Sequence, residues 1–388
     1  MSRGAELSRS RRLLLVGAGH AHLHLLQRSR ELTDAGYAVS LLAPATFAYS
    51  GVASAVATGA LPTGTGTLDV AALVAGRPVT HHVGELVQLD LPGHRARTSI
   101  GDWLGWDVVS LNIGSVAMDE GIDVHPDVLA IKPLESLGEL RQRIAVAQRD
   151  RSSLAQDSPN APTKPRDGQP AQVTVVGGGP SGLELAGNLA VRPDTRVTIL
   201  EAAASIDPQL SQRARRRVLR LLGSRGVRVR TRTTVTRIEL GEVTLADGNT
   251  MKHDVAVLAT GLVSPPLVQR LGLDGGRDGI PVRSTLQHRD HDDVYAVGDC
   301  ADFLARPLER IGVYGVRQGP VLLRSLLARP TGGVLPEFVP QRHALQILDL
   351  GGGVGLAVRG RWWWQGRSAL RLKRWIDRRW LRGYQRGG

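Results

Sequence analysis

Residues 172–201 read QVTVVGGGPSGLELAGNLAVRPDTRVTILE, in which an apolar strand, a glycine turn, a helix and a second strand follow one another. Gly177, Gly179 and Gly182 have GxGxxG spacing directly after the first strand, and Glu201 ends the second strand 19 residues past the last glycine. The glycines permit a tight turn, the helix N-terminus offers N–H groups to a pyrophosphate, and the carboxylate can accept from ribose hydroxyls. The stretch therefore predicts a βαβ unit that binds a dinucleotide; the alternative is a glycine turn that serves only the fold.

The composition limits the classes of protein that this chain can represent. With 388 residues, 42% hydrophobic content and 46 glycines, it has the size of a soluble α/β protein with two or three domains. The single cysteine, Cys300, excludes a disulfide relay and a cysteine metal site, because both need several thiols. No apolar run approaches the ~20 residues of a transmembrane helix. The apolar stretch near the start ends at Gly17, so we expect a cytoplasmic protein without an export signal.

A second, weaker glycine turn lies near the start of the chain, where residues 11–27 read RRLLLVGAGHAHLHLLQ. Gly17 and Gly19 hold the first two motif positions, but His22 stands at the third, which the helix tolerates only if it packs less tightly on its strand. The following strand ends at Ala43 without an acidic residue. If this turn holds a dinucleotide, the adenosine ribose is held differently from the one at the later turn.

The histidines His20, His22 and His24 could suggest a metal site. Alternate residues on a helix point about 200° apart, so the three side chains cannot converge on one ion. No fourth ligand lies nearby in the sequence. We therefore expect no metal here, and instead packing or contact with a bound cofactor.

The rest of the chain alternates strands and helices, as an α/β fold requires. Two further apolar strands, in residues 108–115 and 254–261, run into glycines. We also expect a β-meander over residues 79–112, a helix over 132–150, a mobile connection over 151–170, a basic surface helix over 211–222 and a small-residue helix over 310–328.

The net charge of +13 is concentrated at the end of the chain, where residues 359–388 contain ten Arg or Lys, one acid and five of the seven Trp. In a helix over 368–382, most arginines lie on one side. The apolar side chains share the opposite arc: Ala369, Leu372, Trp375, Ile376 and Trp380. This pattern predicts a helix that lies in a membrane interface. The alternative is a helix that docks on the protein itself or on a second subunit. A defined apolar arc favours a membrane over a nucleic acid, so we expect no nucleic-acid partner.

Two glycine turns, two strands that end in glycine (NIGS at 112–115 and LATG at 258–261) and a late YAVGDCA at 295–301 occur in a specific order. This order resembles the two-dinucleotide-binding-domain flavoproteins, the pyridine nucleotide-disulfide oxidoreductase superfamily, here without the redox disulfide. The resemblance implies two Rossmann-like domains, with the NAD domain inserted in the FAD domain. It also implies that the first turn binds FAD, the second binds NADH and Asp299 bonds the ribityl region of FAD.

The resemblance also implies domain boundaries and site residues. The FAD-binding domain would comprise residues 1–130 and 263–330, the NAD(H)-binding domain 131–262, and a C-terminal segment 331–388 would end in an amphipathic helix. The residues implied for FAD are Gly17, Gly19, His20, Leu86 and Asp299, and those for NADH are Gly177, Gly179, Gly182, Glu201 and Gly261. Glu184 matches a family glutamate near the flavin and nicotinamide and is expected to be catalytic; the alternative is an ordinary acid on the helix surface.

Within this superfamily, GAGHAH at 17–22, AYSGVASAVATG at 48–59 and LKRWIDR at 372–378 look like type II NADH dehydrogenase-like proteins and the FAD/NAD module fused to selenide, water dikinase. One departure concerns the electron acceptor. Arg317 and Gln318 stand in place of the paired glutamines of the family's quinone-side helix, so the acceptor stays open.

The resemblance implies transfer of hydride from NADH to flavin N5 and of electrons onward. We expect a membrane quinone as acceptor, reached by a peripheral protein on the cytoplasmic face. The alternatives are a soluble flavin reductase with another small or protein acceptor, and a flavin-containing redox-sensing or nucleic-acid-binding protein. Glu201 would repel a 2′-phosphate, which predicts NADH over NADPH. The oligomeric state is open, a homodimer included.

Overall fold

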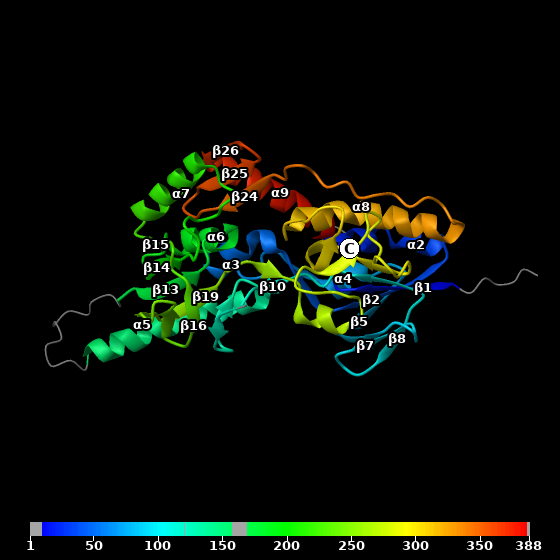
Figure 1. The fold of residues 1–388 in the computed structure, drawn as a ribbon, viewed down its shortest axis with the longest axis horizontal. Coiled ribbons are helices and arrows are strands. Elements are labelled where there is room, and N and C mark those ends of the chain that lie inside the picture. Colours follow the sequence, from blue (N-terminus) through cyan, green and yellow to red (C-terminus); the bar gives the residue numbers. More distant parts are fainter. Residues whose placement is uncertain (1–9, 120, 157–168, 386–388) are drawn as a thin grey trace, which may run out of the picture.

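The computed structural model describes residues 10–119, 121–156 and 169–385 and contains two five-stranded parallel sheets (Figure 1). The first sheet contains, in spatial order, β22 (Val294–Ala296), β9 (Val108–Leu111), β1 (Arg11–Val16), β2 (Tyr37–Ala43) and β5 (Val79–Val83). The second contains β12 (Leu129–Ala130), β19 (Val255–Leu258), β13 (Ala171–Val176), β14 (Thr195–Leu200) and β15 (Arg228–Arg230). The expected α/β fold with two Rossmann-like sheets is confirmed.

The first unit is organised around β1, whose last four residues are all buried, as in a parallel sheet covered on both faces. The helices α1 (His20–Gln27) and α8 (Gly312–Ala328) pack against each other, and α2 (Ser29–Asp34) follows α1. Gly319 allows this close approach, because a Cβ there would lie 2.9 Å from the Cβ of His24. The small residues of α8 therefore serve helix packing.

The second unit is organised around β13 and α6 (Pro180–Leu189), with α7 (Gln212–Ser224) after β14. The helix expected over 132–150 differs in its bounds: a 3₁₀ turn, η2 (Leu134–Glu139), leads into α5 (Leu140–Gln156). The prediction that a mobile connection begins at residue 151 was wrong, because α5 continues to Gln156. Residues 157–168 lie outside the described part of the chain.

The expected meander over 79–112 is shorter than predicted. Its first and last strands, β5 and β9, belong to the first parallel sheet. Only β6 (Leu86–Asp90), β7 (Arg95–Thr98) and β8 (Trp103–Gly105) form an antiparallel sheet. A short run of apolar residues does not tell which strands pair with one another, so it does not distinguish an antiparallel strand from a strand of a parallel sheet.

The chain enters the second unit near β10 and leaves it near β20, and these two crossings lie side by side. β10 (Val116–Ala117) pairs antiparallel with β20 (Leu262–Val263). The domain boundaries expected at 130 and 262 remain predictions; these residues lie at the end of β12 and the start of β20.

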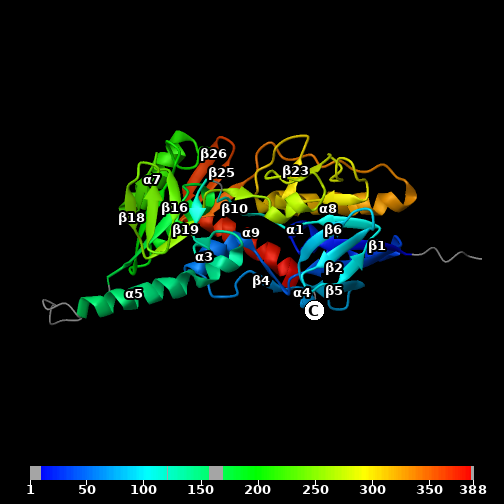
Figure 2. The same ribbon diagram turned by 60° about the horizontal axis from the view of Figure 1, so that its bottom comes forward.

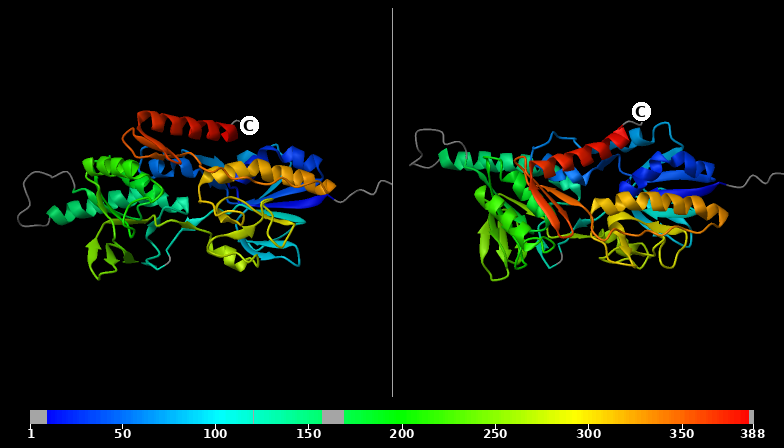
Figure 3. Two further views of the ribbon diagram at one scale, coloured as in Figure 1. Left: turned by 45° about the horizontal axis from the view of Figure 1, so that its top comes forward. Right: turned by 90° about the horizontal axis from the view of Figure 1, so that it is seen from above.

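The C-terminal segment forms an antiparallel sheet of β24 (Gln346–Asp349), β25 (Gly355–Arg359) and β26 (Trp362–Gly366), followed by α9 (Arg367–Gln385). Figures 2 and 3 show α9, in red, running from this sheet by the second unit towards the first. Leu381 belongs to the core of the first unit, whereas Leu348 and Leu356 of the small sheet belong to the core of the second. The C-terminal segment thus packs on both units.

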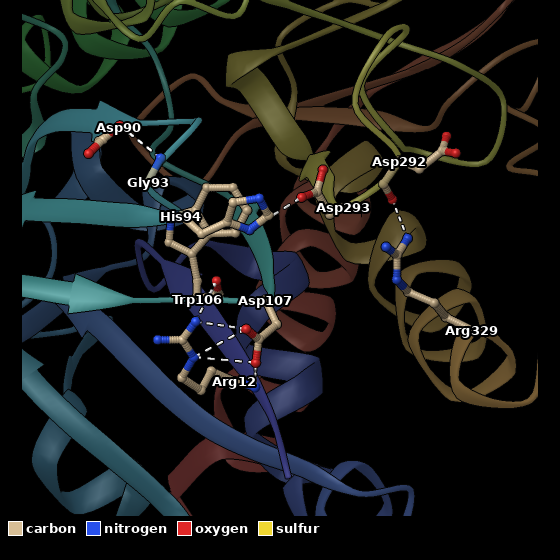
Figure 4. Close-up of polar contacts among 9 residues, drawn as sticks. All are labelled: Arg12, Asp90, Gly93, His94, Trp106, Asp107, Asp292, Asp293 and Arg329. Atoms are coloured by element: carbon tan, nitrogen blue, oxygen red, sulfur yellow. Dashed lines mark hydrogen bonds and ion pairs between the residues drawn. The ribbon is translucent and has the colours of Figure 1, made fainter. Parts of the chain in front are cut away.

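A polar cluster joins the start of β1 to the residues just before β9, and it joins the meander to the residue just before β22 (Figure 4). Arg12 donates to both carboxylate oxygens of Asp107, with Nη2 2.7 Å from Oδ1. The buried Trp106 packs on His94, whose Nδ1 lies 3.6 Å from Oδ2 of Asp293. These contacts hold β1, β9 and β22 in register.

The remaining short elements connect or cap these layers. They are β3 (Thr46–Ala48), η1 (Ser50–Val52), α3 (Ala53–Ala57), β4 (Thr67–Asp69), α4 (Val70–Val74), β11 (Asp123–Val124), β16 (Val235–Ile238), β17 (Glu242–Leu245), β18 (Thr250–Lys252), η3 (Pro266–Arg270), β21 (Ile280–Val282), η4 (Gly298–Cys300), β23 (Ala301–Phe303) and η5 (Arg329–Thr331).

Candidate functional site

A cavity of about 920 Å³ lies where the two units meet. The first unit contributes the glycine turn before α1, the loop around η1, and η4 with the start of α8. The second unit contributes the first turn and a half of α6. The predicted site residues on its wall are Gly17, Gly19, His20, Leu86, Glu184 and Asp299.

The first glycine turn is braced by Asn112, which follows β9. Its Oδ1 accepts from the N–H groups of Ala21 and His22 at 3.2 and 3.4 Å, and its Nδ2 donates to Val297 O at 2.8 Å. A Cβ on Gly19 would lie 2.4 Å from Asn112 Oδ1, so this approach requires glycine. The side chain therefore takes two N–H groups of the α1 N-terminus and joins them to the strand that leads to Asp299.

His22 fills the third motif position, and its ring lies between α1 and the glycine turn, whereas at the second turn the helix approaches directly. The ring is buried, with Nδ1 2.6 Å from Gly17 O and Nε2 2.8 Å from Ser110 Oγ. Burial lowers the pKa of His22 to about 4, so the ring is neutral at physiological pH. At the second turn the helix contacts the turn directly through Gly182. At the first turn the His22 imidazole fills this space and makes two hydrogen bonds, one to the turn and one to β9.

Asp299, in η4, lies on the cavity wall beside a buried lysine. Its Oδ2 lies 2.8 Å from Lys132 Nζ and accepts from Ser115 Oγ at 2.7 Å. Burial alone would raise the pKa of Asp299, but the ammonium and the two hydrogen bonds hold it below its usual value. Asp299 is therefore ionised, and both bonds go to one of its two oxygens.

His20 forms part of an aromatic cluster that joins the cavity wall to α9. Its ring lies 5.5 Å from Phe47, 5.7 Å from Tyr49 and 5.0 Å from Trp380. Tyr49 and Trp380 stack at 4.5 Å. Burial lowers the pKa of His20 to about 4, so the ring is neutral and can contact an uncharged ring system.

In the second glycine turn, α6 packs directly on the backbone at Gly182, whereas the space at Gly179 is empty. A Cβ on Gly182 would lie 2.1 Å from Gly177 O, so α6 approaches the turn directly. A Cβ on Gly179 would meet no atom within 4 Å, which leaves open space at the α6 N-terminus. Glu201 accepts from Gly178 N and Ala203 N, each at 2.7 Å, and so lies beside this space.

Glu184, on α6, lies between the cavity and α9. Asp349 N donates to its Oε1 at 2.6 Å. Burial raises the pKa of Glu184 to about 7, although the nearby Lys373 ammonium works in the opposite direction. Lys373 donates to Gly51 O at 2.6 Å and lies 3.4 Å from Asp377, which accepts from Tyr49 Oη. A titratable group poised near neutrality thus touches the cavity.

Gly261 has a φ of +117° at the end of β19, and its carbonyl accepts from Met118 N, so it shapes the crossing between the units. Leu86 is buried on the cavity wall. Arg310 precedes α8 and donates to Asp299 O at 3.0 Å and Leu262 O at 3.2 Å. Arg310 therefore links the wall of the cavity to the second crossing.

The predicted apolar arc of α9 is divided between two environments. Ala369 is fully buried and Trp380 joins the aromatic cluster, whereas the Trp375 side chain is 60% exposed. Trp380 thus packs on the first unit, as the docking alternative expects, whereas Trp375 remains exposed, so attachment to a membrane surface stays a prediction. Among the described residues, no helix is both long and apolar enough to cross a bilayer.

Three polar residues of the site were missed in the sequence: Asn112, Lys132 and Lys373. Asn112 was visible only as the first residue of the NIGS stretch, and Lys132 as a charge directly after an apolar strand. Lys373 was one cation among ten near the end of the chain. Each of these residues acts through contacts with residues that lie 17 to 322 positions away in the sequence. Local sequence patterns do not predict such contacts.

The cavity fits FAD in its chemistry. The glycine turn and the remaining N–H groups of α1 suit a pyrophosphate, and the ionised Asp299 can accept from hydroxyl groups. Apolar wall residues such as Phe47 and Val313 suit a flat ring system.

Comparison with known proteins identifies the family. The model of the pyridine nucleotide-disulphide oxidoreductase family matches residues 125–320, about half of the chain. This chain belongs to that family, whose members depend on FAD and NAD(H).

Two curated relatives illustrate the range of this family. The nitric oxide reductase FlRd-NAD(+) reductase of Salmonella arizonae is 30% identical over 189 residues, 43% of this chain and 48% of the relative. The type II NADH:quinone oxidoreductase of Haemophilus influenzae is 28% identical over 151 residues, 35% of this chain and 34% of the relative. The chain thus aligns with a third to a half of these relatives.

A solved structure of NDH2 from Plasmodium falciparum in complex with NADH matches nearly the whole fold. The TM-score is 0.77, with 98% of this chain and 99% of that chain covered, at 12% sequence identity. At this identity the likeness establishes the fold, including the C-terminal segment, and leaves substrates to the residues of the site.

Proposed function

We propose that this chain is an FAD-dependent oxidoreductase that takes hydride from NADH and passes the electrons to a membrane quinone. The observation that supports it is a cavity to which both glycine-turn units contribute walls. Bound FAD supplies a ring that accepts hydride and releases electrons. The chain's own task is to bring this ring and a nicotinamide together and to exclude water.

The residues of the cavity wall and those of the second glycine turn, which lies outside this wall, divide this task. The turn at Gly17 and Gly19 holds the pyrophosphate, Asp299 accepts from the ribityl chain and Leu86 lies by the adenine. The turn at Gly177, Gly179 and Gly182 holds NADH, with its ribose at Glu201 and Gly261 beside the crossing. His20 and the α8 N-terminus line the end of the cavity nearest α9.

Glu184 is the candidate catalytic residue because it touches the cavity and its pKa lies near 7. Reduction of a quinone consumes two protons with two electrons, and hydride transfer from NADH supplies only one of these protons. A carboxyl group that is half protonated near neutral pH can deliver the other. Asp349 N donates to this carboxyl from the C-terminal segment, and the nearby Lys373 ammonium acts against the rise of its pKa.

NADH is the proposed donor because the Glu201 carboxylate lies at the end of β14 and would repel a 2′-phosphate. The comparison of kcat/KM for NADH and NADPH tests this. We expect at least a tenfold preference for NADH, about 1.4 kcal/mol, and a smaller preference in Glu201→Gln. Faster turnover with NADPH would contradict the assignment.

The acceptor is tested by anaerobic reduction with NADH followed by reoxidation with quinones. We expect the flavin absorbance to bleach with NADH and to return on addition of a quinone. A bleached flavin that no quinone reoxidises would contradict quinone as the acceptor while leaving the NADH half-reaction intact.

Attachment to a membrane surface on its cytoplasmic face is proposed through the outer side of α9. Trp375 lies there with Arg378, Arg379 and Arg382 around a surface hollow, a combination that suits anionic headgroups. Deleting α9 would also expose Tyr49 and Glu184, so substitutions are the sharper test. We expect Trp375→Ser with Ile376→Ser to reduce sedimentation with anionic phospholipid vesicles, and Trp103→Ser, at another exposed Trp, to leave it unchanged.

A second candidate is a reductase for another small or protein acceptor. It is favoured by the packing of Trp380 on the first unit and by the burial of Ala369, which leave fewer apolar side chains of α9 for a bilayer. The Salmonella relative is named as a reductase of this kind. Reoxidation of the reduced protein by a ferredoxin-like or rubredoxin-like protein, and not by quinones, would decide for this candidate.

A further inference from the structure

Lys132 ties together three segments at the wall of the cavity. It follows β12, where the chain enters the second unit, and its Nζ lies 2.8 Å from Asp299 Oδ2. It also donates to Ser115 Oγ at 2.9 Å, and that hydroxyl donates to the same carboxylate oxygen. The Lys132 and Asp299 side chains are only 19% and 13% exposed.

Two charges at this depth are costly to remove from water, and the cost is offset only when the pair is well hydrogen-bonded. The bonds to the carboxylate from the described residues go to Oδ2, so Oδ1 can accept from a ligand in the cavity. Without Lys132, burial would favour the protonated carboxyl, which is a poorer acceptor.

The other charged groups around the pair do not replace Lys132. Arg310 binds the backbone carbonyl of Asp299 and donates to three further carbonyls, those of Leu262, Arg277 and Asp278. His20 faces the pair but is neutral at physiological pH. The remaining charged groups on the cavity wall are Glu85, Glu135, Glu184 and Arg270.

We propose that Lys132 is a positioning residue for the flavin: its ammonium orients the Asp299 carboxylate towards the ribityl chain and balances the negative charge of that carboxylate beside the cofactor. This inference rests on the proposed binding of FAD. It assigns to Lys132 two separable effects. One is on the affinity for FAD, and the other is on the reduction potential, because an unbalanced carboxylate disfavours the negative charge of the reduced ring.

The affinity is tested by titrating FAD into the apoprotein of the full chain and following flavin fluorescence. Lys132→Met is expected to weaken FAD binding roughly tenfold to a hundredfold, the effect of losing a charged hydrogen bond. Lys132→Arg is expected to recover most of this loss, because a guanidinium can still bind the carboxylate. Lys252→Met, at an exposed lysine on β18, serves as the matched control and should bind FAD like the wild type.

The reduction potential of the bound flavin shows whether Lys132 acts through its charge or only through packing. At mildly alkaline pH, where Asp299 stays ionised, we expect a lower midpoint potential in Lys132→Met, a higher one in Asp299→Asn, and a return towards the wild-type value in the double variant. If Lys132→Met keeps the wild-type affinity and potential, or if the double variant stays as low as Lys132→Met, the inference is wrong. If the wild-type protein itself binds no FAD, the proposed function fails instead.

Discussion

In both glycine turns the first glycine donates to the strand beside it, Gly17 N to Leu42 O and Gly177 N to Leu200 O, each at 2.8 Å. The turns differ in what fills the space around this shared backbone. The first turn is held by side chains from other elements. In the second, the helix rests directly on the turn, and open space lies at its N-terminus.

One pair of equivalent positions accounts for much of this difference. Asn112 N donates to Val16 O, and Ala259 N donates to Val176 O, so the two residues occupy the same place in the two units. The Asn112 amide occupies the N-terminus of α1, whereas Ala259 has no polar side chain to offer. A site braced by the protein suits a cofactor that stays bound, and an open site suits one that must exchange at every turnover.

The largest expected effect follows from the direct contact in the second turn. Gly182→Ala would place a Cβ 2.1 Å from Gly177 O, where the backbone cannot yield. We expect the free energy of unfolding to fall by about 3 kcal/mol, measured by urea denaturation. Gly179→Ala is the control, because open space surrounds it. Equal stability of the two variants would contradict the contact.

At the third position of the first turn, the protein should lose stability when the side chain is removed, whereas at the second turn it loses stability when a side chain is added. Removing the His22 ring loses two buried hydrogen bonds, so His22→Ala is expected to destabilise the protein by about 2–3 kcal/mol. His22→Gly, which restores the usual motif, should be no more stable. His24→Ala, at a less buried position on the same helix, provides the control. A His22→Gly variant more stable than the wild type would show that the ring is a mere substitute for glycine.

The equivalence of Asn112 and Ala259 can be tested from both sides. Asn112→Ala leaves the N–H groups of Ala21 and His22 without their acceptor and is expected to weaken FAD binding about tenfold. Ala259→Asn is expected to raise KM for NADH by a similar factor, because the new amide would occupy the α6 N-terminus. FAD fluorescence and steady-state kinetics measure the two effects. An Ala259→Asn variant with unchanged KM would show that the space at the second turn is not used by NADH.

The smallest effect concerns pH and distinguishes the titratable groups of the two units. Burial holds the pKa of His20 down to about 4 and raises that of Glu184 to about 7. The protonated fraction of Glu184 therefore falls as pH rises through 7, while His20 stays neutral. We expect reoxidation of the flavin to slow about tenfold per pH unit above 7, whereas its reduction by NADH stays constant over this range.

Glu184→Gln should abolish this pH dependence and lower the rate below pH 7, as stopped-flow absorbance can show. It should also remove a contribution to stability. A raised native pKa stabilises the folded protein below the ordinary pKa of a carboxyl, and this stabilisation is lost as pH rises through 7. An unchanged pH profile in Glu184→Gln would leave the carboxyl as an ordinary buried acid.

Local patterns in the sequence are sufficient for the elements of the fold. Glycine spacing, apolar runs and the acid at Glu201 predicted both βαβ units, because each such unit is a local structure of about 30 residues. The bounds of α5 and the allocation of β5 and β9 were wrong, because the pattern of apolar residues does not report which strand pairs with which.

The amino-acid sequence by itself determined the fold class, the two glycine turns and the residues that line them. Only the tertiary structure decided how those turns are completed: Asn112 and His22 reach across the first unit, Lys132 joins Asp299, and Trp380 of α9 packs beside His20. The physical reason is distance along the chain. A turn is set by neighbouring residues, whereas the charge and packing of a buried site depend on groups that meet only when the sheets and helices assemble.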